Sequence, residues 1–575
     1  MASGRGRLVP RRGIGIMTTL SATEASGLRR LWGRASEVFA ELPLALFVLL
    51  FVALPAAALF AGAVDRFGAG TGFAALVWGP SLGSQVARRA LENSFVQGGL
   101  SAGLAVAWGY PCGVFLGRHG FRGRDLLFSF LLIPFLLPPL VVVLGIDELF
   151  GGSSPLASGL GVLGHGLPAI VLANVFYNAS IVALFTSAAI ANASPRLEEA
   201  VESLGGGGWR RFRDVWGRGS LLGAASGGLL TFLLSFVGFA APLLLGGPSN
   251  YTIEVWIYSL TRTVYAAPTL GAGLALWTVA LLCIPAVLYL VVARRARLIG
   301  GRERGTPRLY PVYWRRPTTA ALAATMVALL VFVGAMLGAV LLLSFHLVGG
   351  GWGIENWSAL FTARTTAAVG IPTGQALVNT LFFAGAATAI VATLVLLVAY
   401  ASTRPRREVG VLEGLAFLPV LLSPVILAFA LRDFWGSSLG MPPFLWTLIV
   451  ASQAALALPF VLQSVRASLR SLPPNPRLAA QTLGASPWRA FWGVDVPLLR
   501  PALVAGATFA FALGLGEFAA TNFLYIPTYT TLVVEAYLLE TLRLPGPASA
   551  LGALLVVVSG IALFLLMRGG NRVRF

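Results

Sequence analysis

Long apolar stretches alternate with short polar segments along the chain from about residue 40 onwards. Because a helix needs about 20 apolar residues to cross the hydrocarbon of a bilayer, each stretch is a candidate span. The first half contains stretches at 43–64, 95–116, 125–146, 166–193, 221–247 and 270–294. The second half contains stretches at 318–345, 378–402, 411–432, 444–466, 501–525 and 549–568. The pattern predicts an all-α, multi-pass membrane protein with about twelve transmembrane helices.

Composition supports the same class of protein. Of the 575 residues, 57% are hydrophobic and only 11% are charged, whereas soluble domains carry about a quarter charged residues. The sequence contains no lysine, so the net charge of +19 comes from arginine. Cys112 and Cys283 both fall in apolar runs, and two such cysteines cannot build a disulfide framework or a metal cluster.

The distribution of arginine predicts the topology. If the N-terminus is cytoplasmic, all but seven of the 41 arginines fall on the cytoplasmic side. The exceptions are Arg66, Arg88, Arg89, Arg262, Arg364, Arg432 and Arg543. By the positive-inside rule we expect both termini in the cytoplasm and a location in the cell (inner) membrane. Because arginine marks topology here, nucleic-acid binding is not expected. The first span lacks a clean cleavage site, so we expect it to stay uncleaved. The acids Asp147, Glu148, Glu254, Glu535 and Glu540 fall on predicted outer loops.

The chain contains an internal repeat. "PRLEEAVESLGGGGWRRF" begins at Pro195, and "PRLAAQTLGASPWRAF" begins at Pro476. After a two-residue slip the offset settles at 279, which pairs Leu204-Gly205 with Leu483-Gly484, Trp209-Arg210 with Trp488-Arg489, Phe239 with Phe518 and Tyr258 with Tyr537. Because each copy has six spans, the repeat is parallel and not inverted. We predict a basic cytoplasmic segment (1–42), a first permease-like module (43–296), an Arg-rich cytoplasmic linker (297–317), a second module (318–568) and a cytoplasmic tail (569–575).

The repeated segment between the fourth and fifth span has the same layout in both copies. A short helical stretch ends in Leu-Gly, a turn follows, and Trp-Arg opens a second short helix. Glycine permits the positive φ that such a turn needs, and Pro487 suits the first turn of a helix. A single polar loop would need no further explanation. The same pattern at equivalent positions of both halves favours a pair of helices that dock onto a soluble partner.

These residues resemble the "EAA" loop of permease subunits of binding-protein-dependent ABC importers. That loop reads Glu-Ala-Ala, three residues, Gly, nine residues, then Ile-x-Leu-Pro. The first copy fits at Glu199, Ala200, Gly205 and Val215, whereas Val201 and Arg218 depart from the pattern. The second copy fits at Ala479, Ala480, Gly484, Val494, Val496 and Pro497, whereas Leu478 replaces the glutamate. Each copy is degenerate at a different place.

Nearly the whole chain is similar to the fused two-module permeases of the ferric-iron and thiamine uptake group. The resemblance implies the fold of a type I ABC importer permease, with two ATPase subunits on the cytoplasmic face, an external solute-binding protein and membrane lipid as partners. It implies that each loop forms a coupling helix in a groove of an ATPase subunit. From the resemblance and the repeat together, the candidate coupling residues are Glu199, Ala200, Gly205, Trp209, Arg210, Ala479, Ala480, Gly484, Trp488, Arg489 and Pro497.

The sequence gives no sign of an enzyme. A phosphate-binding loop of the Gly-x4-Gly-Lys-Ser/Thr type needs a lysine, so we expect separate subunits to hydrolyse ATP. His119, His165 and His346 are far apart and pair with no nucleophile or carboxylate at a recognisable spacing. We therefore expect no catalytic residue, no metal site and no cofactor.

Three positions inside the predicted spans are candidates for the translocation pathway. Glu517 is an acid within an apolar run, and an ionisable group there suggests function; its repeat counterpart is Gly238. Glu517 either faces the pathway or accepts hydrogen bonds that serve packing, and the sequence leaves both open. Asn178 also lies within a span, where interhelical hydrogen bonding is favoured over contact with solute.

Two other classes of function agree less well with the sequence. A secondary, ion-coupled transporter with twelve helices and a parallel duplication would explain the repeat, but not the paired Leu-Gly-Trp-Arg segments, and it would be expected to bury several ionisable groups for ion coupling. A membrane-embedded enzyme lacks a catalytic constellation. The sequence favours an importer permease for a small solute, with ferric iron and thiamine suggested by the resemblance.

Overall fold

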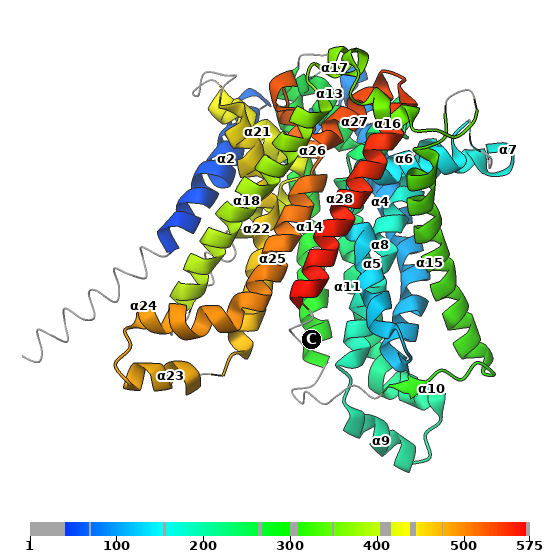
Figure 1. Ribbon diagram of the computed structural model, residues 1–575, viewed down its shortest axis with the longest axis vertical. Helices are drawn as coiled ribbons and strands as arrows, with labels where there is room; N and C mark the ends of the chain where they lie inside the picture. The colour runs from blue at the N-terminus through cyan, green and yellow to red at the C-terminus, as the bar shows by residue number, and fades with distance from the viewer. Residues whose placement is uncertain are drawn as a thin grey trace, which may run out of the picture.

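The computed structural model describes residues 41–67, 71–152, 154, 157–262, 267–299, 309–347, 350–402, 416–436, 444–473 and 475–570. Long helices run side by side through the molecule (Figure 1). Within the described residues, ten helices are long and apolar enough to cross a membrane, or up to eleven if one bent pair is counted as a single span. The prediction of an all-α membrane protein is confirmed.

The first module contains the elements from η1 to α14. They are η1 (Leu49–Ala53), α2 (Leu54–Phe67), α3 (Thr71–Trp78), α4 (Leu82–Arg118), β1 (His119–Gly120), α5 (Arg124–Leu136), α6 (Pro139–Phe150), α7 (Ala157–Leu160), η2 (Gly161–Leu163), α8 (Gly166–Ala191), α9 (Pro195–Ser203), α10 (Gly208–Arg211), η3 (Phe212–Trp216), α11 (Gly217–Phe236), α12 (Ala240–Leu244), η4 (Pro248–Asn250), α13 (Ile253–Arg262) and α14 (Pro268–Ile299). Of the turns labelled η, η1 and η3 are π-helical and the other two are 3-10.

The linker strand and the second module repeat this order. They are β2 (Tyr310–Pro311), α15 (Pro317–Leu343), α16 (Glu355–Ala359), α17 (Ala363–Val369), α18 (Thr373–Ser402), α20 (Leu418–Leu421), α21 (Pro424–Gly436), α22 (Leu445–Ser471), α23 (Asn475–Thr482), α24 (Pro487–Ala490), η5 (Phe491–Asp495), α25 (Val496–Gly516), α26 (Ala519–Leu524), η6 (Pro527–Tyr529), α27 (Leu532–Thr541) and α28 (Pro545–Gly570). Strands β1 and β2 form a two-stranded parallel pair.

The third span of each module explains why fewer continuous spans exist than the twelve predicted. In the first module α5 and α6 meet at a bend of 92°, next to Pro138 and Pro139. In the second, α20 and α21 meet at Leu422–Ser423 before Pro424, and the predicted residues 411–415 lie outside the described part of the chain. Proline removes a backbone donor and disrupts the helix interior, so each third span is broken.

Close packing of three helices forms the centre of each module. In the first, α4 contacts α8 and α11, and in the second, α18 contacts α22 and α25. The α4–α8 contact depends on glycines four residues apart. A Cβ added at Gly109 would lie 2.4 Å from the carbonyl oxygen of Ala179, and one at Gly113 would lie 2.5 Å from Cβ of Thr186. Small residues of this kind let helix backbones approach closely in membranes.

The first long helix of each module packs against the other module. Helix α2 contacts α21, and α15 contacts α4 and α6. The indole N–H of Trp435 donates to the carbonyl of Leu50 at 3.1 Å, and that of Trp108 donates to the carbonyl of Thr325 at 3.1 Å. The two modules are therefore interlocked in space, although each is continuous in sequence.

Candidate coupling loops and translocation pathway

The two repeated loops lie at the same end of the molecule, opposite α13 and α27 (Figure 1). Helices α9 and α23 each end in a turn of the same type. Gly205 and Gly484 have left-handed φ values of 72° and 90°. The N–H of the next residue bonds back to the helix in both copies, from Gly206 to Val201 and from Ala485 to Ala480. This is the Schellman arrangement, in which glycine ends a helix without strain.

The second short helix of each loop is not separate, which corrects the sequence prediction. The chain from Gly208 to Phe236 and that from Pro487 to Gly516 each form one long helix. Each passes through a π-helical turn, η3 or η5, at equivalent positions of the repeat. Such turns absorb an extra residue within a continuous helix. The short helix after each turn is therefore the first part of a candidate membrane span and not a separate element.

The predicted coupling residues lie on the surface of this end of the molecule. Leu204 and Leu483, at the tips of the turns, are 81% and 88% exposed, and Trp209 and Trp488 are 70% and 49% exposed. Ala480 is half-buried, and the other predicted positions are exposed: Glu199, Ala200, Gly205, Arg210, Ala479, Gly484, Arg489 and Pro497. Large apolar side chains this exposed outside the bilayer indicate a surface that a partner covers.

The two loops are fastened to the membrane helices differently. In the second loop, the ring of Tyr400 on α18 lies 5.1 Å from that of Trp488 and 5.2 Å from that of Phe491. Arg477 and Asp495 approach to 3.4 Å within the same loop. In the first loop, Glu198 is buried and forms an ion pair, although the sequence did not predict a role for it. The next residue, Glu199, was predicted as a coupling residue and is exposed.

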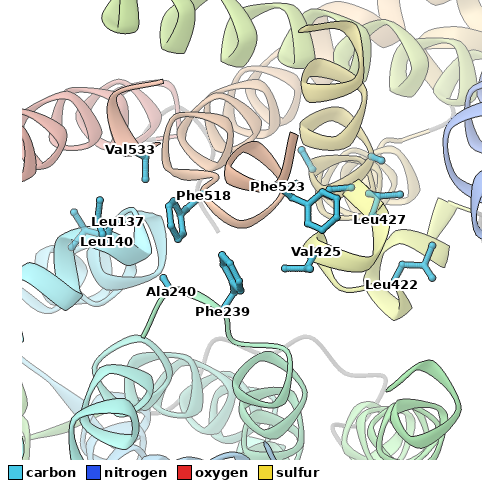
Figure 2. Packing of buried hydrophobic residues seen from close by; sticks show 14 of the residues in the cluster. Leu137, Leu140, Phe239, Ala240, Leu422, Val425, Leu427, Phe518, Phe523 and Val533 are labelled. Atoms are coloured by element: carbon cyan, nitrogen blue, oxygen red, sulfur yellow. The ribbon is translucent and has the colours of Figure 1, made fainter. Parts of the chain in front are cut away.

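A cluster of aromatic rings closes the centre between the modules. The ring centroids of Phe239 and Phe518, one from each repeat, are 5.6 Å apart (Figure 2). Tyr258 lies 5.2 Å from Phe239, and Tyr537 lies 5.3 Å from Phe518. These four residues form two pairs of the 279-residue repeat, Phe239 with Phe518 and Tyr258 with Tyr537. The repeat signal therefore contained this cluster, although the sequence alone did not show that the pairs meet.

Glu517 is buried, and its hydrogen bonds hold the short helix α26. One carboxylate oxygen accepts from the N–H of Ala520 at 2.8 Å, and the other accepts from the N–H and the hydroxyl of Thr521 at 2.8 and 2.6 Å. Charge-assisted bonds of this kind are the strong ones in proteins. These hydrogen bonds of Glu517 agree with the one of its two possible roles that concerns packing, in which the carboxylate accepts hydrogen bonds from its surroundings. At the equivalent place Gly238 has no side chain, and α12 begins there without such a cap.

Asn178 belongs to a buried polar cluster on α8 and α4. Its amide donates to the carbonyl of Asn174 at 2.8 Å. The amide of Asn174 in turn donates to Gln97 at 3.0 Å and to Ser101 at 3.1 Å. The bonds of Asn174 join α4 to α8, whereas the amide of Asn178 bonds within its own helix, so the interhelical role expected of Asn178 itself stays a prediction. The structure brings neither Asn178 nor Gly238 into contact with Glu517 through a described hydrogen bond.

Two acidic residues at the end opposite the loops do not lie where the sequence predicted. Glu254 and Glu535 do not lie on open loops; they are fully buried in α13 and α27. Glu254 accepts from Ser423 at 2.7 Å, and Glu535 accepts from Thr373 at 2.5 Å. Asn93 and Asn379 each donate to two backbone carbonyls that precede α13 and α27. These short helices are therefore pinned in the same way in both modules. Among the described residues, no group of three or more His, Cys, Asp or Glu could hold a metal ion.

Comparison with known proteins finds one family in both halves of the chain, and each match includes one of the two loops. The profile of the family described as "Binding-protein-dependent transport system inner membrane component" matches residues 109–298 and 410–571, together more than half of the chain. The chain is 26% identical over 575 residues to the ferric transport system permease protein FbpB of Actinobacillus pleuropneumoniae, covering 95% of this chain and 80% of that protein. It is 27% identical over 466 residues to the thiamine transport system permease protein ThiP of Escherichia coli, covering 77% and 82%. A shorter match, 36% identical over 126 residues, covers 20% of this chain and 54% of the molybdenum transport system permease protein ModB of Haemophilus influenzae.

Proposed function

The chain belongs to the family of inner membrane components of binding-protein-dependent transport systems, and from this premise we propose which part of the importer each region forms. It is a fused two-module permease of an ABC importer, a multi-pass protein of the cytoplasmic membrane and a transporter rather than an enzyme. We assign the translocation pathway to modules 43–296 and 318–568. Segments 1–42, 297–317 and 569–575 are assigned to the cytoplasmic side.

The loops α9–α10 and α23–α24 are the proposed docking sites for two separate ATPase subunits. One observation supports this most strongly: two glycine-terminated helices, related by the repeat, expose Leu204 and Leu483 at the same end of the molecule. Each continues into a membrane span through a π-helical turn. A groove on each ATPase subunit that moves during ATP hydrolysis would then move α11 or α25 as a rigid body.

The proposed solute is ferric iron or thiamine, presented at the opposite end by an external solute-binding protein. The support is similarity to one permease named for ferric transport and one named for thiamine transport, each matched over most of its length. The proposed pathway runs through the centre where Phe239 and Phe518 meet, beside Glu517, Gly238 and Asn178. Uptake of radiolabelled ferric iron and of radiolabelled thiamine by the same reconstituted complex distinguishes the two solutes.

Arginine substitutions in the second loop test the docking proposal. We expect Ala480→Arg and Gly484→Arg to abolish solute uptake while ATP hydrolysis and membrane insertion persist, because a long charged side chain blocks close contact with a groove. The matched control is Ser471→Arg, which places the same charge on an exposed position at the end of α22. Uptake that is unchanged in both loop variants would show that this loop does not couple hydrolysis to transport.

A further inference from the structure

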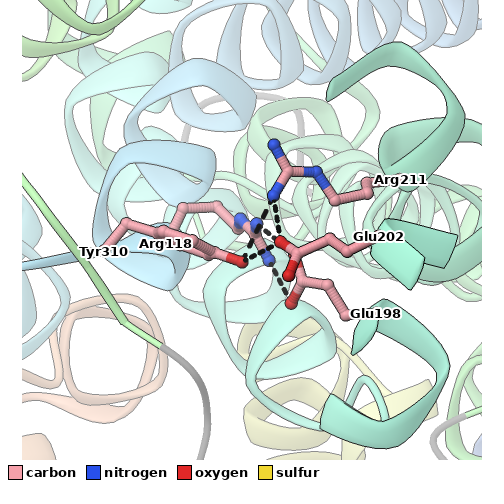
Figure 3. Close-up of polar contacts among 5 residues, drawn as sticks. All are labelled: Arg118, Glu198, Glu202, Arg211 and Tyr310. Atoms are coloured by element: carbon pink, nitrogen blue, oxygen red, sulfur yellow. Dashed lines mark hydrogen bonds and ion pairs between the residues drawn. The ribbon is translucent and has the colours of Figure 1, made fainter. Parts of the chain in front are cut away.

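A network of charged and aromatic side chains joins three separate segments next to the first loop (Figure 3). We call it the linker clamp, and it consists of Arg118, Glu198, Glu202, Arg211 and Tyr310, with Trp216 beside it. Arg118 ends α4, the two glutamates lie on α9, and Tyr310 lies on strand β2 of the linker between the modules. The clamp thus connects a membrane helix, the first loop and the linker.

Arg118 is the centre of the clamp. Its guanidinium donates to both carboxylate oxygens of Glu198, at 3.2 and 2.5 Å. The two side chains are only 13% and 5% exposed. The same guanidinium lies over the ring of Trp216 at 4.9 Å and over that of Tyr310 at 4.7 Å. A planar guanidinium that is bonded to both oxygens of a carboxylate and also lies against two aromatic rings is restricted in its orientation.

Tyr310 adds the linker to this arrangement through its ring, its hydroxyl and its backbone. Its ring covers Arg118. Its hydroxyl donates to Glu202 at 3.3 Å, and the same carboxylate pairs with Arg211 at 2.5 Å. Its backbone pairs with His119 in the two-stranded sheet. The linker is therefore held against both the end of α4 and the helix α9, rather than only spanning the two modules.

The second loop is held by a different arrangement. At the 279-residue offset Arg477 takes the place of Glu198, and Asp495 takes the place of Trp216. These two residues approach each other at 3.4 Å within the loop itself. Glu198 of the first loop thus pairs with Arg118 at the end of α4. Arg477 of the second loop instead pairs with Asp495, in the helix that continues into its own span. The linker contact described above, made by Tyr310, is with the first loop and the end of α4.

We infer that Tyr310 is a positioning residue for energy coupling: it holds Arg118 against Glu198, so that movement of α9 is passed to α4 as well as to α11. This inference rests on the proposal that α9–α10 docks an ATPase subunit. Without the ring of Tyr310, the guanidinium loses one of the two rings that lie against it, and the ion pair that joins α9 to α4 is held less firmly. The ATPase cycle would then continue while less of its movement reaches the membrane helices.

The test uses the complete importer in lipid vesicles, with its ATPase subunits and binding protein. The measured quantity is the number of solute molecules transported per ATP hydrolysed. We expect Tyr310→Ala to lower this ratio by roughly fivefold, since a partly buried cation–π contact and a hydrogen bond are lost. Tyr310→Phe keeps the ring over Arg118 and is expected to restore most of the ratio. The control is Tyr313→Ala, which removes a linker ring that covers Arg316 at 4.9 Å and is half-exposed.

Two further measurements separate the possible outcomes. Glu202→Gln weakens both the hydrogen bond from the hydroxyl of Tyr310 and the ion pair with Arg211 without removing a ring, and it is the test if Tyr310→Ala does not fold. Leu204→Cys, in a chain with Cys283→Ser, reports by crosslinking whether the first loop touches an ATPase subunit. No crosslink would reject the docking proposal and this inference with it. A crosslink together with a wild-type transport ratio in both Tyr310→Ala and Glu202→Gln would reject the positioning role alone.

Discussion

Replacement of Gly205 by alanine isolates the contribution of one backbone angle to docking. Gly205 has a φ of 72°, and a Cβ added there would meet no atom within 4 Å. The cost therefore comes from the left-handed conformation alone, which is roughly 1–2 kcal/mol for a residue other than glycine. If the ATPase subunit binds only the native turn, its dissociation constant should rise about 5- to 30-fold.

The matched control is Gly208→Ala in the same loop. Gly208 is helical, does not belong to the glycines with positive φ, and has open space at its Cβ position. Alanine favours a helix more than glycine does, so we expect binding to be unchanged or slightly tighter. Titration of purified ATPase subunit against the chain in lipid nanodiscs measures both variants. Equal affinities for Gly205→Ala and the wild-type chain would refute the reasoning, and so would a loss of affinity in Gly208→Ala of the same size.

Three other predictions concern the centre and the opposite end of the molecule. Phe518→Ala removes a ring 5.6 Å from Phe239, so we expect increased ATP-independent solute leak from vesicles, whereas Phe382→Ala on the exposed face of α18 should leave the leak unchanged. Glu517→Gln should lower the melting temperature in detergent, by an amount equivalent to about 1–2 kcal/mol, without changing the KM for uptake; a large change in KM alone would instead place Glu517 in contact with solute. Burial, and then the nearby Asp147 and Glu148, raise the pKa of Glu540 from 4.5 to about 7. The folded state then binds an extra proton between these values, so stability falls as pH rises from 4.5 to 7; Glu540→Gln should flatten that part of the melting curve against pH, and an unchanged slope would contradict the assignment.

Much of the fold was accessible from the sequence because it depends on features that a linear pattern carries. Apolar length predicts spans, and a repeat of 279 residues predicts equivalent positions, including the glycines at 205 and 484. The family resemblance is confirmed by the domain matches in both halves. These features are local or periodic, and they do not depend on which helices meet.

The sequence was less informative where structure depends on contacts between distant segments. The sequence indicated that spans rich in glycine and proline could be broken or kinked, but it did not show which spans break or at which residue. The second short helix of each loop was predicted as separate because a π-helical turn has no clear sequence signal. Arg118, Glu198 and Tyr310 were not recognised as a unit, since they are separated by 80 and 112 residues and come together only when β1 pairs with β2. The burial of Glu254 and Glu535 likewise depends on distant partners, Ser423 just before α21 and Thr373 in α18.

The central claim is that this chain moves solute only when separate ATPase subunits drive it. Solute uptake is measured in vesicles that contain the chain alone, or the chain with its ATPase subunits and binding protein, each with ATP or with an imposed ion gradient. The account predicts uptake only in the complete complex with ATP, and no ATP hydrolysis by the chain alone. Uptake by the chain alone under an ion gradient would contradict it.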